Sequence, residues 1–122
     1  MAEAVNPKRF DLEERTEEFA RDVRRFLKML PRGAANDEDG RQLLRASGSV
    51  GANYIEANEA VSRKDFILRI KICRKEAKES GYWLRLLDLE ECGADLTAWR
   101  DDLNREAMEL MKIFGAILRK SE

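Results

Sequence analysis

The stretch that decides the fold runs from residue 62 to residue 87 and reads SRKDFILRIKICRKEAKESGYWLRLL. Its apolar residues recur at intervals of three and four, the spacing that gives an α-helix one buried face. Six residues share that face: Phe66, Ile70, Cys73, Ala77, Leu84 and Leu87. At the start, Ser62 and Asp65 have the spacing of a capping box, in which their side chains accept hydrogen bonds from unpaired backbone N–H groups. We therefore predict a helix over residues 63–91.

Three further segments show the same apolar periodicity. They predict helices over residues 9–30, 37–60 and 96–120, the first ending before Pro31, whose ring cannot continue a helix without the loss of a hydrogen bond. Asn36 and Asp37 are candidate N-caps of the second helix. Because the connections are only a few residues long, neighbouring helices should run antiparallel. We expect an all-α, up-down-up-down four-helix bundle that occupies residues 1–122 as a single domain.

Two glycines lie inside the second predicted helix. Gly48 and Gly51 each cost up to about 1 kcal/mol relative to alanine in a helix interior. Their presence indicates either a kink in this helix or a neighbouring helix that packs closely against its backbone.

Composition narrows the classes of function. The 122 residues include 23 Lys and Arg against 24 Asp and Glu, a formal net charge of -1, and no His. The absence of His excludes Ser-His-Asp triads, Cys-His triads and His-ligated zinc in their ordinary forms. The two cysteines, Cys73 and Cys92, are too few for a zinc ribbon and are interpreted as free thiols. We expect no enzyme activity, no metal or other cofactor and no small-molecule substrate.

The distribution of apolar residues also bears on location. No stretch approaches the roughly 20 apolar residues of a transmembrane helix, and residues 1–10 lack the apolar segment of a secretory signal. The apolar helix faces are needed for the core, which argues against a role at a membrane surface. The expected location is the cytoplasm, with no membrane contact.

Positive charge is concentrated on one side of the third predicted helix. At 100° per residue, four lysines fall within about 60° of one another, opposite the apolar face: Lys64, Lys71, Lys75 and Lys78. Residues 63–78 hold seven basic and two acidic residues, so this segment carries +5 in a chain of net charge -1. Such a stripe is either a solvated helix face or a binding site for nucleic acid or another polyanion.

A second apolar flank on the same helix predicts contact with another subunit. Ile72, Trp83 and Leu86 lie roughly 90–140° from the core face, where a monomer would leave them partly in water. Glu76 and Glu79 share this flank, and Arg45, Asn53 and Glu56 form a polar line on the second helix. We interpret these eight residues as a candidate subunit interface; the alternatives are a broad single core for the apolar residues and plain solvent exposure for the polar line.

Four runs in the middle of the chain carry a family resemblance. They are QLLRASGSV at 42–50, ANYIEA at 52–57, SRKDF at 62–66 and KEAKESGYWLRLL at 75–87. Together they resemble the bacterial four helix bundle proteins, also called 23S ribosomal RNA intervening-sequence proteins, over roughly residues 10–120. The positions that match the family's recurrent residues are Arg45, Ser47, Asn53, Glu56, Ser62, Asp65, Phe66 and residues 82–84.

The resemblance implies a four-helix protomer that assembles into a homopentameric ring, in a family without established catalysis. The accessory variability protein of diversity-generating retroelements is similar, and its pentamer engages a reverse transcriptase and nucleic acid. Two hypotheses follow for this chain. The first is a non-enzymatic, homo-oligomeric scaffold that binds RNA, DNA or a nucleic-acid enzyme through its basic helix face. The alternative is a protein-only scaffold that docks a partner protein without nucleic-acid contact.

Overall fold

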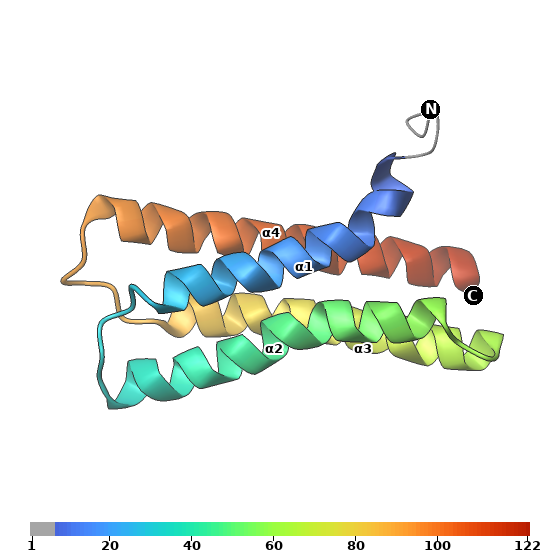
Figure 1. Cartoon of the computed structure of the whole chain (residues 1–122), viewed down its shortest axis with the longest axis horizontal. Coiled ribbons are helices and arrows are strands. Elements are labelled where there is room, and N and C mark those ends of the chain that lie inside the picture. The colour runs from blue at the N-terminus through green and yellow to red at the C-terminus, as the bar shows by residue number, and fades with distance from the viewer. Residues whose placement is uncertain (1–6) are drawn as a thin grey trace.

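The computed structural model describes residues 7–122, with side chains from residue 12 onward. These residues form four helices and no strand: α1 (Pro7–Leu27), α2 (Ala34–Asn58), α3 (Arg63–Leu86) and α4 (Ala94–Ser121). Successive helices run in opposite directions and are joined by short loops (Figure 1). Helix α3 packs against α2 on one side and α4 on the other, and α1 closes the bundle against α2 and α4. The predicted all-α four-helix bundle is confirmed.

The core contains residues of α3 that the apolar periodicity predicts to be buried. Ile70, Cys73, Ala77 and Leu84 are fully buried, and Leu87 is buried just beyond the helix. The largest fully buried side chains from the other helices are Phe26, Leu43, Leu110 and Phe114. The Ser62 half of the capping box is present, because the Ser62 hydroxyl oxygen accepts a hydrogen bond of 3.0 Å from the backbone N–H of Asp65. The start and the buried face of α3 are therefore as predicted.

Helix α3 ends at Leu86, five residues before its predicted end. Leu87 takes an extended conformation, and the loop that follows buries Leu87 and Leu89 in the core. The prediction of residue 91 is wrong because apolar residues in a buried loop continue the apolar pattern without continuing the helix. The other three helices have bounds within three residues of the predicted ones.

Asn36 holds this loop in place instead of capping α2. Helix α2 begins at Ala34, so Asn36 lies inside its first turn, where it is buried. Its side-chain N–H₂ donates to the carbonyls of Pro31 (3.2 Å) and Asp88 (3.0 Å), and its carbonyl oxygen accepts from the N–H of Asp88 (2.9 Å). The N-cap prediction for Asn36 is wrong, since its amide satisfies buried backbone groups in two loops.

The two glycines of α2 lie in different surroundings. A Cβ atom on Gly51 would lie 2.9 Å from the Thr16 hydroxyl oxygen and 3.2 Å from the Thr16 Cβ. Thr16 is itself buried, and its hydroxyl donates to the Leu12 carbonyl at 2.8 Å. A Cβ atom on Gly48 would meet only the end of the flexible Arg24 side chain, at 3.6 Å. Gly51 therefore permits the close approach of α1 to α2, one of the two alternatives that the sequence left open.

This difference predicts opposite effects of the same substitution. Gly51→Ala should lower the free energy of unfolding by about 1–3 kcal/mol, because Thr16 must move to make room. Gly48→Ala should leave it unchanged or raise it by up to about 1 kcal/mol, because alanine favours the helix and nothing rigid obstructs it. Urea denaturation of both variants measures the difference. Equal effects at the two positions would contradict the close contact between α1 and α2.

Candidate functional site

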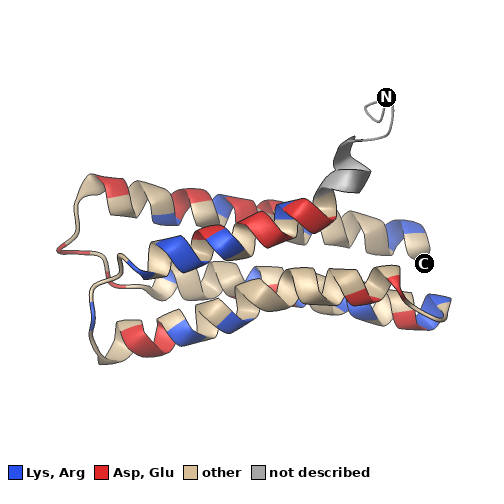
Figure 2. Ribbon diagram, in the orientation of Figure 1, with Lys and Arg blue, Asp and Glu red and all other residues tan. Residues whose placement is uncertain are grey.

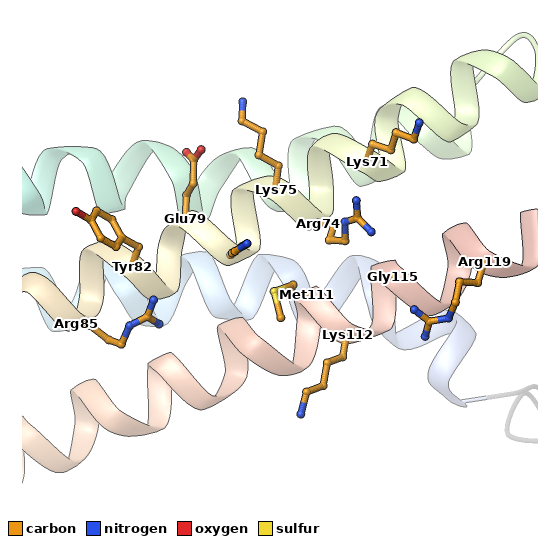
Figure 3. Close-up of a pocket in the computed structure, with 11 residues that line it drawn as sticks. Lys71, Arg74, Lys75, Glu79, Tyr82, Arg85, Met111, Lys112, Gly115 and Arg119 are labelled. Atoms are coloured by element: carbon orange, nitrogen blue, oxygen red, sulfur yellow. The ribbon is translucent and has the colours of Figure 1, made fainter. Parts of the chain in front are cut away.

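A groove runs along the surface between α3 and α4, with a volume of about 800 Å³. We call it the basic groove, because seven of the eleven residues that line it are Lys or Arg and one is acidic. Its lining residues are Lys71, Arg74, Lys75, Lys78, Glu79, Tyr82 and Arg85 from α3, with Met111, Lys112, Gly115 and Arg119 from α4 (Figure 3). Met111 and the Arg85 guanidinium lie between the two helices, whereas Lys75 and Lys112 extend from opposite edges (Figure 3).

Most of the positive charges in the groove have no acidic partner. Lys75 lies 3.8 Å from Glu76, and Arg85 donates to the Asn104 side-chain oxygen at 2.9 Å. Within residues 12–122, the remaining five basic residues of the groove form no salt bridge: Lys71, Arg74, Lys78, Lys112 and Arg119. Unpaired charges of one sign along a concave surface concentrate a field that attracts anions.

Acidic residues elsewhere in the chain account for the near-neutral total, and several of them pair with basic residues outside the groove. Residues 13–18 of α1 hold four acidic residues and one basic residue, whereas the last turn of this helix is basic (Figure 2). Glu17 accepts from Arg21 and Glu18 from Arg25 within that helix, and Glu106 of α4 accepts two hydrogen bonds from Arg15. The net charge of -1 therefore conceals one groove in which basic residues predominate.

Three of the four predicted lysines line the basic groove. Lys71, Lys75 and Lys78 do so, whereas Lys64 is exposed in the first turn of α3 and is not among the lining residues. Sequence reasoning did not single out Arg74 and Arg85 of α3, nor Lys112 and Arg119 of α4. The two α4 residues are seven apart and so lie on one side of that helix. This spacing was the available sequence signal. It indicates a shared basic groove only once α4 is known to pack beside α3.

The opposite flank of α3 collects part of the predicted subunit interface. A groove of about 250 Å³ between α2 and α3 is lined by Gln42, Arg45, Ala46, Ser49, Glu76, Glu79 and Trp83. Four of the eight predicted interface residues thus lie together: Arg45, Glu76, Glu79 and Trp83. Trp83 is partly buried against the core, and its ring meets the Tyr82 ring edge-on, with centroids 5.1 Å apart. Leu86 remains 46% exposed, and Ile72 is half-buried.

The other four predicted interface residues, among them Asn53 and Glu56 of α2, do not line this groove. The Asn53 side chain bonds within the chain, where its N–H₂ donates to the Ser49 carbonyl and its oxygen accepts from Arg69 at 3.0 Å. It therefore links α2 to α3. Glu56 is exposed on α2.

The carboxyl group of Glu76, in the groove between α2 and α3, has a raised pKa. Burial raises its pKa above the ordinary value of 4.5, and the nearby Glu79 carboxylate raises it further. Lys75 and Arg45 act in the opposite direction but do not cancel these effects. The negative charge of Glu76 is therefore unfavourable in the folded chain.

Neither cysteine forms a disulfide. Cys73 is buried in the core, where its thiol donates to the Val50 carbonyl at 3.4 Å. Burial raises the pKa of Cys73 to about 12, so the group is a thiol at neutral pH. The interpretation of both cysteines as free thiols agrees with the structure.

The described residues support neither a metal site nor a membrane-spanning helix. Within them, no three His, Cys, Asp or Glu residues are placed to hold a metal ion together. No described helix combines the length and the apolar character needed to cross a membrane.

The four antiparallel helices and two lateral grooves define a small helical-bundle protein whose α3 contributes to both grooves. The chain belongs to the 23S rRNA-intervening sequence protein family, which it matches over residues 8–115. It is similar to a crystal structure from Bacteroides thetaiotaomicron VPI-5482, described as a protein of unknown function from the S23 ribosomal protein family. The two are 32% identical, with a TM-score of 0.70, and the match covers 87% of this chain and 96% of that one. No curated protein matches.

The raised pKa of Glu76 predicts a dependence of stability on pH. Between pH 4.5 and its folded-state pKa, Glu76 binds more protons in the folded than in the unfolded chain. The free energy of unfolding should therefore fall as pH rises through this interval. Glu76→Gln should remove this contribution, whereas Glu59→Gln, at the exposed residue that follows α2, should retain it. Urea denaturation at a series of pH values tests this, and identical pH profiles for Glu76→Gln and the parent chain would contradict it.

Proposed function

We propose that this protein is a non-enzymatic, homo-oligomeric binding module of the cytoplasm that holds nucleic acid along the basic groove. The observation that carries the proposal is the gathering of five basic side chains without acidic partners on one groove. A nucleic-acid enzyme that presents its bound strand to this groove would be a partner of the same class.

The dimensions of the groove suit a chain of phosphates. Residues 71 and 85 are separated along α3 by about 21 Å at 1.5 Å per residue, so the basic residues between them form a track and not a single point. A polymer that neutralises several charges along such a track gains affinity from released counterions. The family's description refers to 23S rRNA, which is a polymer of this kind.

The opposite flank of α3 supports self-association. Leu68 and Leu86 of α3 are 54% and 46% exposed, and Trp83 lies beside the polar residues Arg45 and Glu76. Aromatic and aliphatic side chains rimmed by polar groups are typical of protein interfaces. We propose that this flank joins copies of the chain, with the homopentameric ring as the expected assembly.

The same apolar flank is the observation that favours the alternative function, a scaffold that docks a partner protein only. The two functions differ in their dependence on salt. Nucleic-acid binding releases counterions from the phosphates, and added salt makes this release less favourable, so the affinity falls. Co-purification of one polypeptide, together with the absence of nucleic-acid binding at low salt, would favour the protein-only scaffold.

Nucleic-acid binding should depend on the lysines of the groove. The variant Lys71→Gln/Lys78→Gln should bind a single-stranded oligonucleotide more weakly, and the slope of log affinity against log salt should fall by about 1.5, because two phosphate contacts are lost. The matched control is Arg24→Gln/Lys28→Gln, which removes two exposed charges, one from the last turn of α1 and one from the residue just after it. Fluorescence anisotropy at several salt concentrations measures both. Equal weakening by the two variants would show that the total charge, and not the groove, determines binding.

Self-association should depend on Trp83. In light scattering, the parent chain should have a mass of about 70 kDa, five times the 14.1 kDa of one chain. Trp83→Arg should shift the mass toward that of the monomer, because it places a charge in the contact. Lys28→Gln, just after the end of α1, is the control and should leave the mass unchanged. A parent chain that stays at 14.1 kDa at micromolar concentration would contradict the assembly.

A further inference from the structure

Two arginines flank Gly115 in the basic groove. Gly115 of α4 has no side chain, and a Cβ atom at its position would lie 3.6 Å from Arg119 Nη1 and 3.8 Å from Arg74 Cδ. Arg74 comes from α3 and Arg119 from the last turns of α4, so the two side chains flank Gly115 from different helices, Arg119 with its guanidinium and Arg74 with its aliphatic Cδ (Figure 3). The bare backbone of Gly115 leaves space beneath them.

Neither guanidinium has a balancing negative charge. Among residues 12–122, no carboxylate lies within ion-pair distance of Arg74 or Arg119. Glu79, the acid that lines the groove, extends from the side of α3 away from α4 (Figure 3). Two neighbouring positive charges repel each other, and a bound anion would remove that repulsion.

The carbonyl groups at the end of α4 are the other negative centre in this region, and they have a partner. Arg63, the first residue of α3, donates to the carbonyls of Ser121 and Glu122. It occupies the C-terminal end of α4, where a cation is favoured. Arg74 and Arg119 are therefore left to bind an anion from outside the chain.

We propose that Arg74 and Arg119 form a phosphate-binding pair above Gly115. Each planar guanidinium can donate two parallel hydrogen bonds, and a tetrahedral phosphate has enough oxygen atoms to accept from two such groups at once. The inference rests on the proposed function in one respect, since it takes the phosphate to be part of a nucleic-acid backbone. Free phosphate has the same chemistry and is the alternative source. Lys71, Lys78 and Lys112 would bind the phosphates on either side as point charges.

The test separates the geometry of the pair from its charge. The variant Arg74→Lys/Arg119→Lys keeps both charges but removes both planar groups. It should bind a single-stranded oligonucleotide at least about tenfold more weakly, while the slope of log affinity against log salt stays unchanged. The control is Arg41→Lys/Arg105→Lys, at two exposed positions outside the groove, which should bind like the parent chain. Circular dichroism establishes that the variants fold, and each single variant should show part of the loss.

A second measurement places the anion directly. Inorganic phosphate should shift the backbone amide resonance of Gly115 in the NMR spectrum of the parent chain, and should not shift it in Arg74→Lys/Arg119→Lys. A different outcome is that phosphate shifts Gly115 while the variant binds oligonucleotide as tightly as the parent chain. That result would assign the site to free phosphate and overturn the proposal that it binds a phosphate of the nucleic-acid backbone. If phosphate leaves Gly115 unchanged and the variant binds normally, the pair itself is overturned.

These outcomes are distinct from a failure of the proposed function. Weaker oligonucleotide binding by Lys71→Gln/Lys78→Gln, together with normal binding by Arg74→Lys/Arg119→Lys, would preserve the basic groove and remove the pair. A parent chain that binds no oligonucleotide but shifts Gly115 with phosphate would remove the nucleic-acid function and keep the pair as a site for free phosphate.

Discussion

The packing of α3 between α2 and α4 is the constraint on which the rest of the structure depends. Its apolar face is fully buried at Ile70, Cys73, Ala77 and Leu84. Since a helix that buries one face has its two flanks beside its neighbours, the position of α3 determines both lateral grooves. The basic groove forms on the α4 side, and the groove lined by Arg45 and Trp83 forms on the α2 side. One helix thus supplies two chemically different surfaces, and neither exists without the bundle.

Much of the fold was predictable because it depends on patterns local to one helix. The apolar face of α3 and the cap at Ser62 are set by residues within a few turns of one another. The end of α3 was not predictable in this way, since Leu87 and Leu89 are apolar but belong to a buried loop. Asparagine is an ordinary N-cap residue, so the sequence around Asn36 predicts a cap. Its different role depends on hydrogen bonds to Asp88, which lies 52 residues away in the chain.

The candidate site shows the same division. Lys71, Lys75 and Lys78 could be grouped from one helix, because a helical wheel contains all the information required. Arg119 could not be added to them, because its place beside Arg74 depends on how α4 packs against α3. Asn53 was assigned to an interface between subunits from its exposed position on the wheel, yet its oxygen accepts from Arg69 of the same chain. Sequence patterns identify faces, whereas partners across helices require the tertiary structure.

The amide of Asn36 has a consequence for the alignment of the helices along the bundle. Apolar stripes that repeat every three or four residues still match when one helix slides by a full turn, about 5.4 Å, past another. A slide of α2 past α3 would break the two hydrogen bonds that Asn36 makes to the backbone of Asp88. A buried polar contact of this kind distinguishes one register from its near neighbours, which the apolar core cannot do alone. One side chain at the end of the bundle thereby helps to set which residues of α2 and α3 face each other.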